Sequence, residues 1–464
     1  MRIEKDSIGE REVADDAYFG IQTLRAFENF SISGTQIHPV FIKSYLLLKK
    51  AAAITNKRLK NLKSSDADAI ISAIDQLINI DAYENNHQYF IVDTFQAGAG
   101  TSQNMNINEV VANKANEILG YKRGTYFPIN PNDHVNMSQS TNDTYPTAMR
   151  LSSLVLSQEL ILELILFSSS LGQKAHEFDS ILKAGRTHLQ DAVPIRLGQE
   201  FMAYQYTIDQ LIKLIREAQM SLRILAIGGS AIGTGINVPK DFRQFILLEL
   251  KKLFNDDKLS LSHNLIADTQ SQLPMMIYSQ ALRASALELT RIINDLRLLS
   301  SGPHTGLNEI ILPKSVPGSS IMPGKINPSM LEMGNQVFFK VIGNDQAMAF
   351  ALQAGQLELN VMMPLMAHLA LESTYIMKNA LKNIRLKCID GILANSKSCT
   401  KYLGLTSQVI TVLNPLIGHA KASELVKEAQ DSDKSILEVI KNKKILTDQQ
   451  FNLLLNLKEM TELK

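Results

Sequence analysis

The sequence predicts a mainly α-helical fold organised around a central bundle of long helices. Five long segments carry apolar residues at helical spacing, and polar or glycine-rich loops separate them. Their apolar positions cover more than one narrow stripe, so each helix must be buried on several sides. The economical solution is a bundle whose outer faces are covered by identical copies of the chain, so we expect an oligomer with long apolar helix–helix contacts. The five segments are approximately 143–178, 196–225, 272–300, 328–352 and 356–385.

The composition excludes several classes of function. The chain has 464 residues, enough for two or three domains, and its 45% apolar and 20% charged residues are typical of a soluble globular protein. A net charge of +1 gives no electrostatic footprint for nucleic acid or an anionic membrane. The charged run from Arg2 to Asp6 argues against a signal peptide, and no apolar run reaches the ~18 residues of a transmembrane helix. We therefore expect a cytoplasmic protein.

The ends of the chain are expected to differ from the bundle. Residues 1–40 show glycine, proline and charges without a long period, which indicates an extended arm with short turns. Helices are predicted at about 41–61 and 66–79, and another follows the glycine-rich turn 96–106 and runs to about residue 119. Shorter helices are predicted in the tail at 405–413, 422–429, 435–442 and 448–457.

Three polar segments precede predicted helices. The first, 96–106, places Thr101 just before a helix start, where Asn104 or Asn106 is a candidate cap. The second, 136–143, contains Ser140, Thr141 and Asn142. The third, 186–191, contains Thr187 and His188. A further glycine-rich stretch, 228–235, lacks the strand–loop–helix unit of a dinucleotide site, so we expect a tight connection between helices there.

The segment 317–328 is the most distinctive stretch of the chain. Its two glycines and three prolines break helix and sheet, so it is predicted to be a shaped loop exposing Ser319, Ser320 and Lys325. Asn327 and Pro328 form a good N-cap and first helical residue for the helix that follows. By composition alone, such a loop is more often a plain connector than a functional segment.

Together these four segments suggest an anion site. Each lies at a predicted helix N-terminus, where unpaired backbone N–H groups favour anions. They offer hydroxyl, amide, imidazole and ammonium groups, which would suit a small dicarboxylate if the segments converge. The simpler alternatives are that Ser140, Thr141 and Asn142 only cap a helix, that His188 is a satisfied loop histidine, and that the Lys325 ammonium is merely solvated. The two cysteines, Cys388 and Cys399, lack metal-ligand spacing, and neither a metal nor a cofactor is expected.

The motifs resemble one family. Gly-Ser-Ser-Ile-Met-Pro-Gly-Lys-Ile-Asn-Pro at 318–328 resembles the signature loop of the fumarase/aspartase superfamily, and the segments 98–106, 138–143 and 185–191 resemble its other motifs. The resemblance covers essentially the whole chain. It implies a mainly α, three-domain fold with an N-terminal domain 1–140, a central helix-bundle domain 141–394 and a small C-terminal helical domain 395–464. It also implies a homotetramer with a multi-helix core, in which each active site takes loops from three subunits.

Within the superfamily, the loops resemble aspartases more than class II fumarases. The first loop reads Gly-Ala-Gly-Thr-Ser-Gln-Asn-Met-Asn and the second Gln-Ser-Thr-Asn-Asp, where fumarases tend to have Gly-Ser-Gly-Thr-Gln-Ser-Asn-Met-Asn and Gln-Ser-Ser-Asn-Asp. The alternatives are a class II fumarate hydratase and a non-catalytic structural relative such as an eye-lens crystallin. The chain departs from the family at His304 and at Lys314-Ser315-Val316, outside the matched catalytic positions.

The resemblance also implies an activity and a role for each matched residue. Aspartases convert L-aspartate to fumarate and ammonia by removing a Cβ proton, which creates an enediolate at the β-carboxylate. Ser319 matches the general base, which must act as an alkoxide or near it, and Glu332 matches the carboxylate that partners His188. The remaining matches are Thr101, Ser140, Thr141 and the signature loop with Ser320 for the β-carboxylate, Thr187, Lys325 and Asn327 for the α-carboxylate, and Asn142 and His188 near the amino group.

Overall fold

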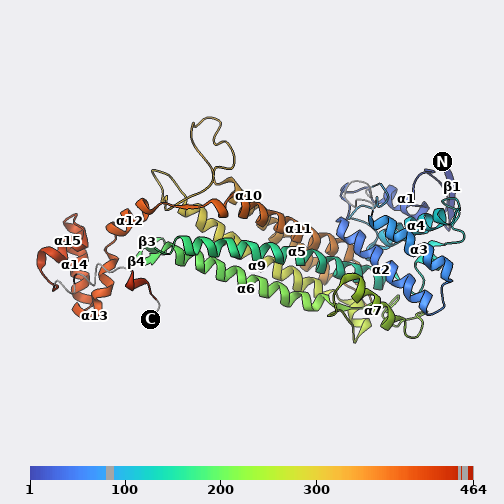
Figure 1. Ribbon diagram of the computed structural model, residues 1–464. Coiled ribbons are helices and arrows are strands. Elements are labelled where there is room, and N and C mark those ends of the chain that lie inside the picture. The colour runs from blue at the N-terminus through green and yellow to red at the C-terminus, as the bar shows by residue number, and fades with distance from the viewer. Residues whose placement is uncertain (80–87, 448–450, 452–457, 463–464) are drawn as a thin grey trace. The chain divides into compact units, whose positions relative to one another are not determined.

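The computed structural model describes residues 1–79, 88–447, 451 and 458–462, and over these residues the protein is mainly helical, as predicted (Figure 1). The chain divides into two compact units. Unit 1 comprises Met1–Ile161, Lys213–Ala286 and Phe339–Lys378. Unit 2 comprises Leu162–Ile212, Leu287–Phe338 and Asn379–Lys464.

All five predicted long helices are present. They are α5 (Thr141–Glu177), α6 (Leu197–Leu222), α9 (Leu273–Leu299), α10 (Ser329–Gln353) and α11 (Met363–Lys387). Only α11 begins clearly later than predicted. The preceding residues form a turn in which Asn360 Nδ2 donates hydrogen bonds to the carbonyls of Ala351 and Leu352, which closes the end of α10.

Buried polar contacts join the long helices within each unit. In unit 1, Tyr278 and Thr374 pair at 2.8 Å between α9 and α11, and Ser279 Oγ donates to Asp345 of α10 at 2.7 Å. In unit 2, Arg385 Nε of α11 donates to Glu163 of α5 at 2.7 Å. Such contacts fix the register of helices whose apolar packing alone would tolerate sliding.

The rest of unit 1 surrounds the ends of these helices. The predicted extended arm is only partly correct, because it contains the hairpin β1–β2 and a helix, α1. The N-terminus of α1 is capped from outside its own segment, by the carboxylates of Glu4 and Glu109. The elements are β1 (Arg2–Asp6), β2 (Gly9–Val13), α1 (Ile21–Asn29), α2 (Pro39–Arg58), α3 (Ser64–Asn79), η1 (Gly98–Gly100), α4 (Thr101–Ile118), η2 (Pro131–Val135), β5 (Ile224–Leu225), α7 (Phe242–Phe254), β6 (Ser260–Leu261) and α8 (Leu265–Gln270).

The rest of unit 2 contains a hairpin and the helices of the tail. The tail helices predicted at 422–429 and 435–442 are confirmed, 405–413 is largely a 3-10 helix, and 448–457 falls almost wholly outside the described residues. The elements are β3 (Leu182–Thr187), β4 (Gln190–Arg196), β7 (Ile310–Ile311), η3 (Ile389–Gly391), β8 (Leu393–Ala394), α12 (Ser396–Leu405), η4 (Ser407–Leu413), α13 (Asn414–Ile417), α14 (His419–Asp431), α15 (Ile436–Lys443) and η5 (Glu459–Thr461).

Helix α5 is long and apolar enough to cross a membrane by length and composition alone. However, 67% of its most apolar window is buried inside the protein, as in the core helix of a soluble fold. The sequence predicts no transmembrane helix, because no uninterrupted apolar run is long enough. The apolar composition of α5 is explained by the residues that it buries against neighbouring parts of the protein.

Candidate functional site

The second polar segment caps helix α5. The backbone N–H of Ser140 donates to Asp143 Oδ1 at 2.9 Å, and Ser140 Oγ accepts from the backbone N–H of Asn142 at 3.2 Å. The capping interpretation of Ser140 is therefore confirmed. Its half-buried side chain and that of Asn142 lie at the positive end of the helix dipole, where an anion is favoured.

The glycine-rich segment 228–235 holds this cap in place through hydrogen bonds. Asp143 Oδ2 accepts hydrogen bonds from the backbone N–H groups of Gly228 at 2.9 Å and Ser230 at 3.0 Å, while Asn142 Nδ2 donates to the Ala231 carbonyl at 2.7 Å. Gly233 adopts φ +86, and a Cβ there would lie 2.6 Å from backbone atoms of α8. The expected tight connection is confirmed, and it also holds residues 140–143 in place.

The first polar segment meets the second inside unit 1. Thr101 is exposed and is the first residue of α4, whose N-cap is Gly100 in the left-handed conformation. The predicted caps are therefore wrong: Asn104 and Asn106 lie within the helix. Asn104 instead donates to Thr141 Oγ1 at 3.0 Å, so it ties the helix that begins at Thr101 to the helix that begins at Thr141.

A buried lysine lies beneath these two segments. Lys49 of α2 is fully buried, donates to Asn136 Oδ1 at 2.9 Å and lies over the ring of Tyr45. Burial lowers the pKa of Lys49 to about 7, although the charge of Asp143 acts in the opposite direction. Burial likewise raises the pKa of Asp143 to about 6, against the effect of its three N–H donors. The space beneath these two segments is therefore polar and poorly solvated.

In unit 2, the third polar segment is a hairpin turn and does not precede a helix directly, so this expectation was wrong. Thr187 ends β3 and pairs with Gln190, while His188 and Leu189 between them both have positive φ, at 55° and 59°. That geometry matches the twist of a two-residue hairpin but favours Asn and Gly over the residues found here. Strained residues of this kind cluster at functional sites, and both Thr187 and His188 are exposed.

The signature loop lies in the connection from α9 to α10 and projects away from the long helices (Figure 1). Ser319 Oγ accepts hydrogen bonds from the backbone N–H groups of Ile321 at 3.3 Å and Met322 at 3.2 Å. The neck of the loop is closed by the Ser319 N–H, which donates to the Lys325 carbonyl at 3.2 Å. A Cβ at Gly318 would lie 1.2 Å from that carbonyl oxygen, so glycine is required there. Ser320 and Lys325 are exposed, as predicted, whereas Ser319 is half-buried.

The helix after the loop begins one residue later than predicted. The N–H groups of Leu331 and Glu332 donate to the Pro328 carbonyl, so Pro328 lies at the boundary and α10 starts at Ser329, with Asn327 half-buried in front of it. Glu332 lies in the first turn and is half-buried. Among the described residues, no hydrogen bond joins Glu332 to His188.

The matched residues therefore form two groups. The structure joins the unit 1 group through Asn104, Asp143 and the glycine-rich segment. The unit 2 group lies on two separate elements, the β3–β4 turn and the signature loop with the start of α10. Unit 1 holds Thr101, Ser140, Thr141 and Asn142; unit 2 holds Thr187, His188, Ser319, Ser320, Lys325, Asn327 and Glu332.

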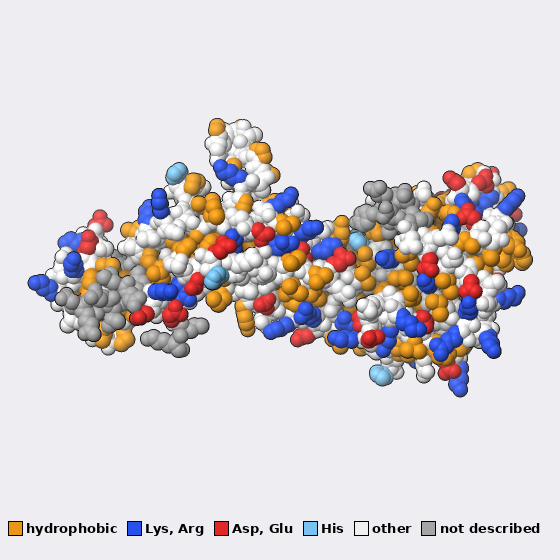
Figure 2. Space-filling model, viewed as in Figure 1, with side chains coloured by type: hydrophobic (Ala, Val, Ile, Leu, Met, Phe, Trp, Pro, Cys, Tyr) orange, Lys and Arg blue, Asp and Glu red, His pale blue; other side chains and the backbone are white. Residues whose placement is uncertain are grey.

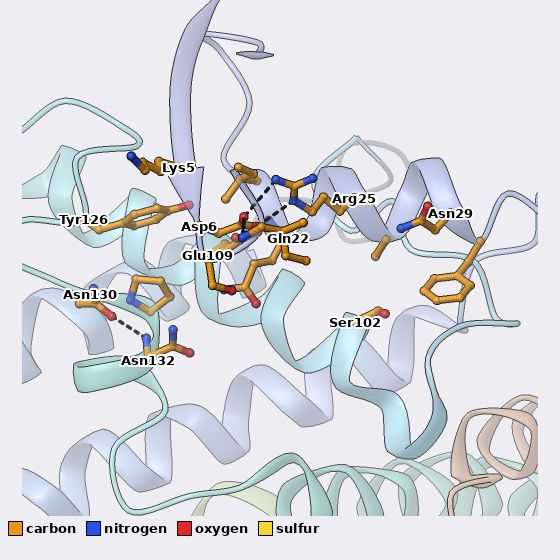
Figure 3. Close-up of a pocket in the computed structure, with 16 residues that line it drawn as sticks. Lys5, Asp6, Gln22, Arg25, Asn29, Ser102, Glu109, Tyr126, Asn130 and Asn132 are labelled. Atoms are coloured by element: carbon orange, nitrogen blue, oxygen red, sulfur yellow. Dashed lines mark hydrogen bonds and ion pairs between the residues drawn. The ribbon is translucent and has the colours of Figure 1, made fainter. Parts of the chain in front are cut away.

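A separate cavity of about 560 Å³ lies in unit 1 (Figure 3). Two of its charged groups pair with each other: Asp6 faces Arg25 at 2.8 Å, and the hydrogen bonds from Arg25 lower the pKa of the Asp6 carboxyl. Glu109 accepts four hydrogen bonds at the start of α1, although burial raises the pKa of Glu109 to about 7. Within the described ranges, no group of three or more His, Cys, Asp or Glu residues is placed to hold a metal ion.

Known proteins are similar to this chain over nearly its full length. The model of a family described as lyase matches residues 9–343, and one described as fumarase C C-terminus matches residues 409–462. The aspartate ammonia-lyase of Bacillus subtilis (strain 168) is 43% identical over 99% of this chain and 96% of its own, and that of Helicobacter pylori (strain ATCC 700392 / 26695) is 46% identical over 97% and 96%. The solved structure of fumarate lyase:delta crystallin from Brucella melitensis bound to cobalt is 42% identical, with a TM-score of 0.95 over 100% of both chains.

Proposed function

The chain belongs to the lyase family of the fumarase/aspartase superfamily, and from this premise we propose that it is an aspartate ammonia-lyase, which converts L-aspartate reversibly to fumarate and ammonia. The observation that carries the proposal is the near full-length identity of 43–46% to aspartate ammonia-lyases, in a chain that keeps every matched catalytic position. Both N-terminal loop sequences are of the aspartase type.

The proposed reaction begins with removal of a proton from Cβ of aspartate. The C–H bond breaks, its proton passes to Ser319 Oγ, and the electron pair moves into the β-carboxylate to give an enediolate. A serine hydroxyl is a poor base, so its alkoxide needs stabilisation. The two backbone N–H groups that point at Ser319 Oγ, from Ile321 and Met322, supply that stabilisation.

The intermediate then collapses to products. The enediolate electrons form the Cα=Cβ bond, and the Cα–N bond breaks with its electron pair going to nitrogen, so the protonated amino group (NH3+) leaves as neutral ammonia. The proton on Ser319 Oγ then passes to solvent, which restores the base. We propose that Thr101, Ser140 and Thr141, with the signature loop and Ser320, stabilise the doubly charged β-carboxylate. Their N–H and O–H donors act most strongly where negative charge develops, which lowers the barrier rather than only tightening binding.

The other end of the substrate would be held by the unit 2 group. We assign Thr187, Lys325 and Asn327 to the α-carboxylate, and Asn142 and His188 to the neighbourhood of the amino group. Lys325 is exposed on the loop and pairs with no carboxylate among the described residues, so its ammonium is available for an anion. His188 with Glu332 as its partner would complete this end of the site.

We propose that the site is assembled in a homotetramer. Long helices of a monomer expose apolar side chains at helical spacing: Leu162, Ile165 and Leu166 on α5, with Leu162 62% exposed, and Phe339 and Phe350 on α10. Figure 2 shows such hydrophobic side chains open to solvent among charged ones. Neighbouring copies of the same helices would cover them, and sites built from three subunits would then join the unit 1 and unit 2 groups.

The domain division 1–140, 141–394 and 395–464 is part of this proposal. Its third part is supported by a separate apolar cluster of the tail helices, which includes Leu403, Val409, Leu425, Ile436 and Ile440. A cytoplasmic location is proposed from the balanced charge of the chain and from the burial of α5.

Class II fumarate hydratase is the alternative activity, favoured by the match of residues 409–462 to the fumarase C C-terminus. A parallel assay separates the alternatives: the purified protein is given L-aspartate in one cuvette and L-malate in another, and fumarate is followed by its ultraviolet absorbance. We expect fumarate from aspartate alone. Fumarate from malate alone would establish the hydratase, and none from either would indicate a non-catalytic relative.

A further inference from the structure

The hydroxyl of Thr141 accepts a hydrogen bond from a buried amide. Thr141 is the first residue of α5 and is 9% exposed, and its Oγ1 atom accepts from Asn104 Nδ2 of α4 at 3.0 Å. Over the described residues, Thr141 Oγ1 donates to no acceptor. A hydroxyl carries one hydrogen, and it cannot be directed at an N–H donor. The hydrogen of Thr141 is therefore left for a partner outside these residues.

The orientation of the Asn104 amide is fixed by its neighbours. The hydroxyl of Tyr45 donates to Asn104 Oδ1 at 2.8 Å, and Asn104 Nδ2 also lies 3.3 Å from Asn136 Oδ1. A flipped amide would place its oxygen against the oxygen of Asn136, so two acceptors would face each other without a hydrogen. Asn104 must therefore present its nitrogen to Thr141.

Asn136 is oriented in turn by groups that can act in only one way. Its Nδ2 atom donates to the carbonyl of Gln139 at 3.4 Å, and a carbonyl can only accept. Its Oδ1 atom accepts from Lys49 Nζ at 2.9 Å. Tyr45 and Lys49 are both 0% exposed, so this network is shielded from solvent. The direction of each hydrogen bond from Gln139 to Thr141 is therefore determined.

The neighbouring hydroxyl is arranged in the same way. Ser140 Oγ accepts from the backbone N–H of Asn142 at 3.2 Å, and it donates to no acceptor within the described part of the chain. Two adjacent hydroxyls thus keep their hydrogens unused inside the protein. Such a pair suits a ligand group that can only accept hydrogen bonds, as an ionised carboxylate does. Donors whose direction is set in advance need no reorganisation when charge develops on that group.

We infer that Asn104 is a positioning residue of the proposed lyase, which donates to Thr141 Oγ1 and thereby keeps the hydroxyl hydrogen of Thr141 directed at the β-carboxylate of the substrate. The inference rests on the proposed function. Tyr45 supports it by holding the oxygen end of the same amide. Asn104 does not touch the substrate in this account, and it acts only through the hydroxyl of Thr141.

Two substitutions of Asn104 test this inference. Asn104→Asp keeps the shape of the side chain but places an acceptor against Thr141, so the hydroxyl turns away from the substrate. Asn104→Leu removes the donor without adding a charge. The matched controls are Asn116→Asp and Asn116→Leu on the same helix, since Asn116 is also fully buried and its Nδ2 donates to the Ile129 carbonyl at 2.8 Å. The readouts are kcat and KM for aspartate, the melting temperature, and the tetramer by light scattering.

We expect Asn104→Asp to lower kcat by roughly a hundredfold, the usual cost of losing one donor to a developing oxyanion, with a smaller change in KM. Asn104→Leu should lose less, because the hydroxyl can still turn toward the substrate. The Asn116 variants should lose melting temperature and keep their kcat. A folded Asn104→Asp tetramer with the wild-type kcat would overturn the inference.

A double-mutant cycle separates positioning from general damage and does not depend on the folding of Asn104→Asp. Thr141→Val removes the hydroxyl through which Asn104 acts. The double variant Asn104→Leu with Thr141→Val should therefore be no slower than Thr141→Val alone. An equal further loss of kcat in the Thr141→Val background would show that Asn104 acts by another route, and would overturn the inference.

The wild-type assay separates failure of this inference from failure of the proposed function. If the wild-type protein does not deaminate aspartate, the function is wrong, and neutron diffraction from wild-type crystals soaked in D2O decides the inference instead. We then expect a deuterium of Asn104 Nδ2 between this atom and Thr141 Oγ1. A deuterium of the Thr141 hydroxyl directed at Asn104 would overturn the inference.

Discussion

The backbone N–H of Ser140 donates a 2.9 Å hydrogen bond to the buried carboxylate of Asp143. The other oxygen of that carboxylate accepts from the N–H groups of Gly228 and Ser230. One side chain therefore connects the start of α5, where Ser140 and Asn142 lie, to the glycine-rich segment behind it. The shape of this half of the proposed site depends on Asp143, although Asp143 itself faces away from solvent.

Asp143→Asn should weaken substrate binding and stability together. An amide offers one acceptor where the carboxylate offers two, so at least one buried N–H loses its partner, at a cost of about 1–3 kcal/mol in the free energy of unfolding. We expect a lower melting temperature and a raised KM for aspartate. The control is Asp257→Asn, at an exposed position of the same unit. A normal KM in Asp143→Asn would show that Ser140 holds its position without this contact.

Ser319→Ala should reduce kcat by at least about a hundredfold, the usual contribution of a positioned general base, and leave the tetramer intact. The alanine cannot accept the Cβ proton, while the backbone of the loop is preserved. The control is Ser315→Ala, which removes a hydroxyl before the loop that matches no family position. Turnover of Ser319→Ala at the wild-type rate would remove this residue from the mechanism.

Lys325→Ala should act mainly on KM. Loss of an ammonium that pairs with the α-carboxylate removes binding energy present before and during the reaction, so kcat should change less than KM. Steady-state kinetics with aspartate measure both constants. Lys314→Ala, at another exposed lysine near the loop, is the matched control. Identical KM values in the two variants would mean that Lys325 is only a solvated surface charge.

Lys49 should make stability depend on pH. Its pKa is about 7 in the folded protein, whereas the ordinary pKa of a solvated lysine is 10.5, so between these values the unfolded chain binds a proton that the folded chain does not. The free energy of unfolding should therefore rise with pH by about 1.4 kcal/mol per unit in this window. Calorimetry at about pH 7 and about pH 9 should show the wild type gaining melting temperature relative to Lys49→Met. A constant difference between the two proteins would show that Lys49 stays charged when buried.

The long helices could be predicted from the sequence because their apolar period is strong and their ends are marked by glycine, proline and small polar residues. The five central helices begin and end close to the expected residues, with α11 the exception. The short helix α1 could not be predicted, because its N–H groups are capped by Glu4 and Glu109, which come from elsewhere in the chain. Tertiary contacts of this kind leave no local pattern.

The site was predictable at the level of motifs but not of geometry. The sequence predicts a loop before a helix at His188, since neither His188 nor Leu189 is a residue that favours the left-handed conformation found there. It likewise predicts a cap at Asn104, yet Asn104 bonds Thr141 from inside α4. The burial of Glu309 against Lys183 and Arg186 likewise had no signal in the sequence, because an isolated glutamate carries no pattern that reveals its burial.

We propose that donor groups from different chains complete each active site, and activity measured in hybrid tetramers tests this proposal. Ser319→Ala alters a unit 2 segment and Ser140→Ala a unit 1 segment, and each variant alone should be severely impaired. In tetramers assembled from both chains at random, about one site in four should receive both segments unaltered, if the segments come from different subunits. We predict that co-expressed hybrids regain about a quarter of wild-type activity on aspartate. Activity no higher than the mean of the two parent variants would show that both segments of a site come from the same chain.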